Sequence, residues 1–269
     1  FFVSVCKLDV AGVAIATVIS QCISASLVLR CMVKDTGPLH LDLKKMRLHP
    51  QAMRQILRIG LPAGFQGILF SLSNVVIQSS VNIFGNIVVA GNSAAANLEG
   101  FVYMAMNAFY QTTLSFVSQN YGAGEQKRIH RIVLLGEACV IVTGTLLGNA
   151  VVFFGNELLH IYSSNPEVIA AGIVRLHYIS MVYALCGIMD VMVGALRGIG
   201  YSVMPMIVSI VGVCVLRLVW LATVFQIPEY HRIETVYLSY PVTWILTSLV
   251  YIVFFIWVRV RTCRKSAAA

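Results

Sequence analysis

Long apolar runs separated by short polar segments are the main feature of this sequence. The runs are continuous rather than alternating, and each is long enough for one helix across a bilayer core, which takes about 20 residues. A transmembrane β-barrel would instead show alternating segments of about ten residues. The pattern predicts seven transmembrane helices, over residues 10–33, 59–84, 94–117, 132–154, 166–196, 205–226 and 236–258.

The composition places this 269-residue chain among integral membrane proteins. Apolar residues make up 58% and charged residues 11%, with a mean hydropathy of +0.83. Soluble domains are roughly half apolar and about a quarter charged. These values exclude a soluble enzyme, a disordered regulator and a secreted disulfide scaffold. The expected fold class is an all-α polytopic membrane protein.

The chain carries a net charge of +8, and its basic residues lie between the apolar runs. We interpret this charge as contact with the lipid bilayer rather than with nucleic acid. One end of the spans holds segment 30–58, turn 127–131, Arg197 and tail 259–269, and the other holds only Lys7 and Arg232. The positive-inside rule then predicts a multi-pass protein of the cell (plasma) membrane, with the connector and the C-terminus in the cytoplasm.

Motifs of enzymatic chemistry are missing from the sequence. It has no GxSxG, HExxH, Walker A or dinucleotide-binding pattern, and its seven cysteines include no CxxC pair. We therefore expect no enzyme activity, no metal site, no organic cofactor and no transport driven by ATP hydrolysis in this chain.

Polar residues recur at helical spacing inside several predicted spans, so that each set shares one face of its helix. The sets are Ser71, Asn74, Gln78 and Asn82; Asn107, Gln111, Ser115 and Ser118; Ser180, Tyr183, Gly187, Asp190, Gly194 and Arg197; and Ser239, Thr243 and Thr247. Two interpretations remain open. The faces enclose a partly hydrated cavity, or they join helices through hydrogen bonds and small-residue packing.

Charged residues deep in a span are costly and therefore informative. Asp190 precedes Arg197 by seven residues, which places it about 10 Å in from the cytoplasmic end of its helix. Arg217 lies well inside the sixth span. We expect these two to form either a buried structural pair or part of a cation or proton site. Near span ends, where side chains can reach water, lie Glu99, Glu137 and Arg175.

Three strings resemble motifs of the multidrug and toxic compound extrusion (MATE) family of secondary antiporters. They are IGLPAGFQGILFSLSNVVIQSSVNIFGN at 59–86, AAANLEGFVYMAMNAFYQTTLSFVSQNYGAGEQKR at 94–128 and GALRGIGYSVMP at 194–205. Together, in this order, they extend the resemblance over nearly the whole chain. The matching structural positions are Gly60, Pro62 and Gln78, then Gln119, Gly122 and Ala123, then Gly194, Arg197, Gly198 and Gly200.

The resemblance implies twelve helices in two six-helix lobes. The first-lobe helices that this chain lacks would then be its partners. On this basis the chain divides into the last helix of the first lobe (1–33), a cytoplasmic inter-lobe connector (34–58), a six-helix second lobe (59–258) and a basic cytoplasmic tail (259–269).

The implied function is a secondary antiporter that exports cationic or amphipathic organic compounds in exchange for Na⁺ or H⁺, by rocking of two lobes. The open alternatives are a lipid-linked oligosaccharide flippase of the same superfamily, and a non-transporting scaffold or membrane-embedded enzyme. The coupling-ion candidates are Asp190 and Glu99, and the candidates for the cavity and its small organic substrates are Asn74, Gln78, Asn107, Gln111, Tyr183 and Arg217.

Overall fold

The computed structural model of the chain describes residues 9–37, 40–42 and 47–267, with the side chains of residues 9, 10, 13 and 259–267 outside this description. Lys7, Lys44 and Lys45 of the predicted connector, and the basic side chains of the predicted tail therefore lie outside this description.

Every regular element in the described ranges is helical, which confirms the all-α fold class. The α-helices are α1 (Asp9–Lys34), α2 (Pro50–Asn82), α3 (Asn86–Gly122), α4 (Gln126–Phe153), α5 (Gly155–His160), α6 (Pro166–Ile179), α7 (Ala184–Gly198), α8 (Val203–Ser209), α9 (Leu216–Ala222) and α10 (Ile233–Ala267). Short 3-10 turns lie at Ser180–Val182 (η1), Val224–Gln226 (η3) and Pro228–Tyr230 (η4), and a π-helical turn lies at Ile210–Val215 (η2).

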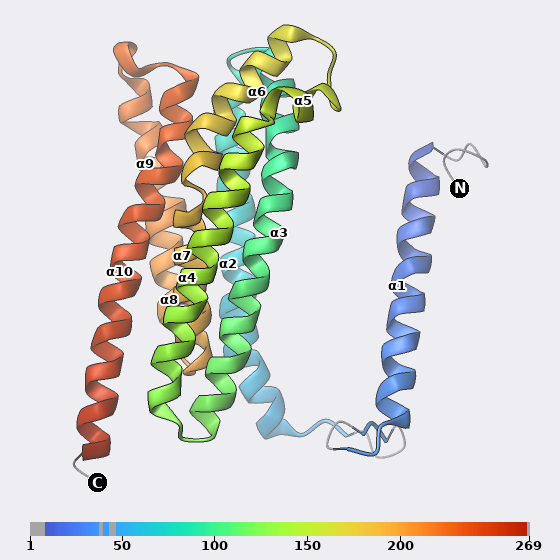
Figure 1. Cartoon of the computed structure of the whole chain (residues 1–269), viewed down its shortest axis with the longest axis vertical. Helices are drawn as coiled ribbons and strands as arrows, with labels where there is room; N and C mark the ends of the chain where they lie inside the picture. Colours follow the sequence, from blue (N-terminus) through green and yellow to red (C-terminus); the bar gives the residue numbers. More distant parts are fainter. Residues whose placement is uncertain (1–8, 38–39, 43–46, 268–269) are drawn as a thin grey trace. The chain divides into compact units, whose positions relative to one another are not determined.

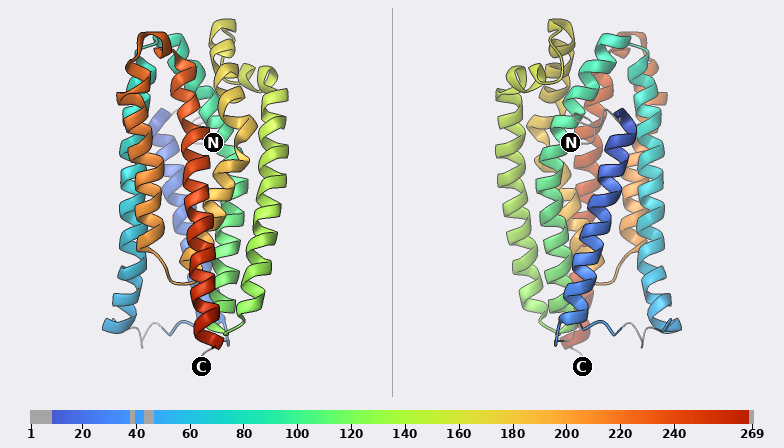
Figure 2. Two further views of the ribbon diagram at one scale, coloured as in Figure 1. Left: turned by 90° about the vertical axis from the view of Figure 1, so that its left-hand side faces the viewer. Right: turned by 90° about the vertical axis from the view of Figure 1, so that its right-hand side faces the viewer.

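The chain divides into two compact units, Phe1–Gln55 and Ile56–Ala269. The first contains α1, whose apolar side chains are exposed on all sides, as Val18, Leu27 and Val28 show. The second contains α2 from Ile56 onward and α3 to α10, and its long helices run side by side (Figures 1 and 2).

Five helical segments are long and apolar enough to cross a membrane, and α6 with α7 makes a sixth if this pair, bent by 46°, is one span. The predicted span 94–117 lies in α3, which is not among them because it carries more polar side chains. Even so, α3 has 37 residues, about 55 Å of helix, and it runs the length of the bundle (Figure 1). We conclude that the chain belongs to a multi-pass membrane protein.

Helix ends follow local sequence signals. Pro166 opens α6, and the side chain of Asn165 accepts a hydrogen bond from the backbone N–H of Glu167 at 2.9 Å, which caps the helix. The turns after α3 and α7 need a left-handed backbone at Gly124 (φ 77°) and Gly200 (φ 96°). Gly200 belongs to the quoted motif, whereas in the other turn Gly124, and not Gly122, adopts this conformation.

Helix α3 is central to the second unit and packs against α4, α6 and α7, while α10 packs against α6 and α7. Small residues allow the close approach of α3 and α7. A Cβ atom added to Gly194 would lie 2.9 Å from the carbonyl oxygen of Tyr110, and one added to Gly198 would lie 2.8 Å from Val117 Cγ1. Gly194 belongs to one of the predicted polar faces, and its close contact supports the packing interpretation at this position.

Candidate functional site: a polar cavity between helices

A cavity of about 510 Å³ lies between α2, α3, α7 and α10 in the second unit. Its charged lining residues are Asp190 and Arg197 from α7 and Arg217 from α9. Aromatic and amide side chains complete much of the wall, among them Phe70, Asn74, Tyr103, Asn107 and Tyr110. The cavity thus combines apolar ring surfaces with a few charges, which is typical of sites for amphipathic organic molecules.

A second cavity of about 350 Å³ adjoins the first and extends to α6. The two have five lining residues in common, Asn74, Tyr103, Tyr183, Tyr240 and Trp244. Tyr183 and Tyr240 each meet the Trp244 ring edge-on, with ring centroids 5.4 and 5.8 Å apart. An aromatic cluster therefore lies where the cavities join.

The structure brings most of the predicted cavity residues together. Asn74, Asn107, Tyr183 and Arg217 line the larger cavity, and Gln78 lines the smaller one. Gln111 is different, because its side chain is exposed and lines neither cavity.

The predicted polar face of α10 has a different environment from the faces that line the cavities. Ser239, Thr243 and Thr247 are buried and donate to backbone carbonyls of their own helix, and Thr243 also accepts a hydrogen bond from Arg217.

Asp190 lies in the wall of the larger cavity, and its carboxyl group has no fixed partner among the described residues. Its Oδ2 atom is inaccessible and accepts no hydrogen bond from the described residues. Arg217 lines the same cavity, but no ion pair joins the two in the part of the chain that the structure describes. The structure therefore does not support the predicted alternative of a direct Asp190–Arg217 pair.

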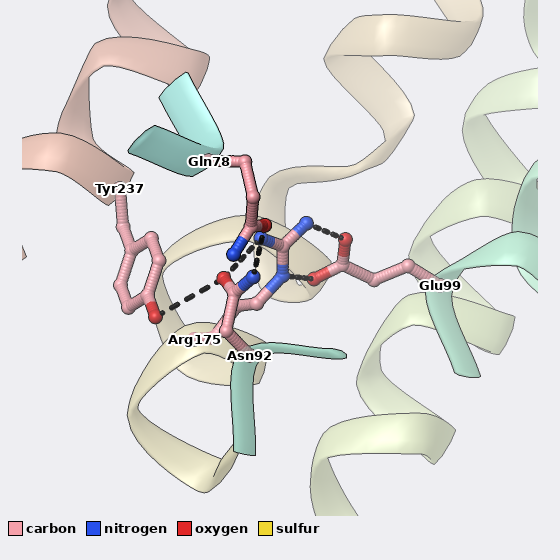
Figure 3. A network of polar contacts seen from close by, with 5 residues as sticks. All are labelled: Gln78, Asn92, Glu99, Arg175 and Tyr237. Atoms are coloured by element: carbon pink, nitrogen blue, oxygen red, sulfur yellow. Dashed lines mark hydrogen bonds and ion pairs between the residues drawn. The ribbon is translucent and has the colours of Figure 1, made fainter. Parts of the chain in front are cut away.

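Glu99 has a different environment, shown in Figure 3. Both of its carboxylate oxygens accept hydrogen bonds from Arg175, at 3.0 Å from Nε and 2.7 Å from Nη2. The two side chains are 4% and 8% exposed, so the expectation that they reach water near a span end is wrong. Their helices, α3 and α6, place them opposite one another inside the bundle, and the ion pair offsets the cost of burial.

The ion pair belongs to a larger network across four helices (Figure 3). Arg175 also donates to Oδ1 of Asn92 at 2.6 Å, and Tyr237 on α10 donates to the same oxygen at 3.3 Å. Asn92 in turn donates to Gln78 of α2 at 3.1 Å. Neither Asn92 nor Tyr237 was predicted from the sequence, although Asn92 precedes Glu99 by seven residues and so lies on the same face of α3.

Arg197 connects the motif at the end of α7 to two other helices. It donates hydrogen bonds of 2.7 Å to the hydroxyl of Tyr110 on α3 and to Oε1 of Gln66 on α2. Gln119 bonds to Ser115 of its own helix at 3.2 Å, near the end formed by Gly122 and Ala123. Gly60 and Pro62 lie in the interior of α2, where a Cβ added to Gly60 would meet nothing within 4 Å.

Two other predicted features can be placed. Glu137 does not reach water as expected, since both of its carboxylate oxygens are inaccessible and without a partner among the described residues. Within those residues, no group of three or more His, Cys, Asp or Glu side chains is arranged to hold a metal ion.

The membrane-crossing helices surround a cavity whose wall holds a carboxylate and guanidinium groups. This arrangement is typical of the multi-pass membrane carriers. The family model described as MatE matches residues 62–223. The chain belongs to this family of transporters, which is not a family of enzymes, and the resemblance seen in the sequence is confirmed.

Individual relatives agree with this assignment. The probable multidrug resistance protein YpnP of Bacillus subtilis is 28% identical over 216 residues, covering 80% of this chain and 48% of its own length. An FAD transporter of Shewanella oneidensis is 27% identical over 166 residues, covering 61% and 36%. A crystal structure of the Vibrio cholerae MATE transporter VcmN, in its D35N mutant, has the same fold, with a TM-score of 0.81, 20% identity and coverage of 98% of this chain and 58% of that one. The chain spans about half the length, or less, of these curated relatives.

Proposed function

We propose that this chain forms one lobe of a secondary antiporter that exports cationic or amphipathic organic compounds in exchange for Na⁺ or H⁺. The matched relatives include a probable multidrug resistance protein and an FAD transporter, which supports an organic substrate. The adjoining cavities, of about 510 and 350 Å³, are large enough for such compounds. First-lobe helices would close the other side of the substrate path and rock against this lobe.

The observation that carries the proposal is the unpartnered carboxyl group of Asp190 in the larger cavity. A charged side chain at the bilayer centre costs about 2.5–3.5 kcal/mol even on insertion scales, so carboxylates are retained there mainly for function. Asp190 is free to bind Na⁺ or to exchange a proton, whereas both oxygens of Glu99 are occupied by Arg175. This contrast favours Asp190 over Glu99 as the coupling residue.

The distribution of basic residues supports an orientation in the cell membrane. The first two turns of α4 carry Lys127, Arg128 and Arg131, whereas the segment between α5 and α6 carries no Lys or Arg. By the positive-inside rule, the start of α4, the connector and the C-terminus face the cytoplasm.

The test is ion-driven export by the complete gene product in proteoliposomes, with an imposed Na⁺ gradient and separately with an imposed pH gradient. Asp190→Asn removes the charge and keeps the shape, and we expect it to abolish export driven by either gradient. Glu125→Gln is the matched control, because Glu125 is an exposed carboxylate in the turn after α3, and it should leave export unchanged. Undiminished gradient-driven export by the Asp190→Asn protein would refute the assignment.

A further inference from the structure

Arg217 is buried in the larger cavity with most of its hydrogen-bonding capacity unused. The residue is 3% exposed and makes one hydrogen bond, from Nη2 to Oγ1 of Thr243 at 2.9 Å. Its Nε atom is inaccessible and has no partner among the described residues. A guanidinium has five N–H groups, so four of them lack an acceptor within the described part of the chain.

The other two arginines that line the cavities, the buried Arg175 and the half-buried Arg197, make more hydrogen bonds than Arg217. Arg175 is neutralised by Glu99 and makes three hydrogen bonds. Arg197 makes two, to Tyr110 and Gln66, although its Nε atom, like that of Arg217, is inaccessible and has no partner among the described residues. Arg217 has no carboxylate partner in the described part of the chain, so its positive charge remains available within the cavity.

The surroundings of Arg217 hold it in place without consuming its donors. Its Cζ atom lies 3.9 Å from the centroid of the Tyr240 ring, so the ring covers one face of the guanidinium. Stacking of this kind covers a face of the guanidinium and leaves the Nη groups at its edge open to an acceptor, whereas Nε is inaccessible. Arg217 is also the second residue after the π-helical turn Ile210–Val215, and such turns are rare and often mark functional sites.

We propose that Arg217, stacked on Tyr240, is a subsite for the carboxylate or phosphate group of an amphipathic organic anion. Planar carboxylates and phosphates match the guanidinium edge and supply the acceptors that it lacks. The inference rests on the proposed substrate cavity and refines its ligand class. The lobe then has a site for an anionic group at Arg217 and a site for a cationic group at Asp190, so that zwitterionic compounds are also substrates.

Two dyes with one ring system and opposite charge test the subsite. Fluorescein is an anion at pH 8 and rhodamine 123 is a cation, and both contain a xanthene ring. Their affinities for the complete gene product in phosphatidylcholine nanodiscs are measured by fluorescence anisotropy. The variants are Arg217→Met, Arg217→Lys and Asp190→Asn, with Arg131→Met as the control, because Arg131 is exposed and lines neither cavity.

We expect Arg217→Met to weaken fluorescein binding at least about tenfold, the loss of a charge-assisted hydrogen bond, and to leave rhodamine 123 binding unchanged or stronger. Arg217→Lys keeps the charge but not the planar edge, and its affinity for fluorescein should lie between those of the wild-type and Met proteins. Asp190→Asn should act in the opposite sense, strengthening fluorescein binding and weakening rhodamine 123 binding. Arg131→Met should change neither.

The outcomes separate this inference from the function on which it rests. Binding of rhodamine 123 without fluorescein would overturn the anion subsite and leave the export function standing. Equal losses for both dyes in the Met and Lys variants would show a structural role for Arg217 and would also overturn it. Binding of neither dye by the wild-type protein would count against both proposals. Competition between fluorescein and added phosphatidylglycerol would support the site and identify a lipid headgroup as a second source of the anionic group.

Discussion

The buried pair of Glu99 and Arg175 allows a quantitative prediction about what stabilises the second unit. Replacing Glu99 by Gln removes the charge that compensates a guanidinium only 8% exposed. Two unit charges about 4 Å apart gain about 4 kcal/mol at an effective dielectric constant of about 20, and breaking a buried pair typically costs about 3–5 kcal/mol. We therefore expect Glu99→Gln and Arg175→Met each to lower the free energy of unfolding by about 3–5 kcal/mol.

The double variant distinguishes the ion pair from simple packing. Once Arg175 is Met, the Glu99→Gln change leaves no uncompensated charge, so the two effects should not add, and the coupling energy should be at least about 2 kcal/mol. The measurement is reversible unfolding in mixed micelles of sodium dodecyl sulfate, followed by tryptophan fluorescence.

The surface pair of Glu125 and Arg128 is the matched control. Its atoms are 3.9 Å apart and its side chains are 53% and 71% exposed, so water screens the interaction. Its coupling energy should be below about 1 kcal/mol in the same cycle. A coupling energy for Glu99 and Arg175 as small as that of this surface pair would refute the reasoning.

Two further predictions concern packing and topology. Gly194→Ala places a Cβ atom 2.9 Å from the carbonyl oxygen of Tyr110 and should lower the free energy of unfolding by about 1–3 kcal/mol. A Cβ atom at Gly60 meets nothing within 4 Å, so Gly60→Ala should be neutral or stabilising. Equal effects of the two changes would contradict the close contact between α3 and α7. In a background without the seven natural cysteines, Ser164→Cys should react with a membrane-impermeant maleimide in intact cells, and Glu125→Cys only after permeabilisation. Reaction of both in intact cells would contradict the proposed orientation.

The long apolar runs of the chain were enough to predict the type of fold, because the bilayer imposes a length and an apolar composition on every span. The motifs around Pro62 and Arg197 were enough to indicate the family. Asn74, Asn107 and Tyr183 could also be assigned to a cavity, since polar side chains at helical spacing share one face. The aromatic wall could not be assigned in this way, because Tyr and Trp in an apolar run look the same whether they face lipid or a cavity.

The sequence by itself determined which residues are polar or charged within each span, and to which face of its own helix each belongs. Glu99 and Asp190 are alike at that level, since each is an acid in an apolar run. Only the tertiary structure separated them, by placing Arg175, 76 residues away along the chain, against Glu99 and leaving Asp190 in the cavity. Helical periodicity sets the direction of a side chain, but its partner depends on how distant helices pack. The environment of a charge in a membrane protein is therefore decided by tertiary packing.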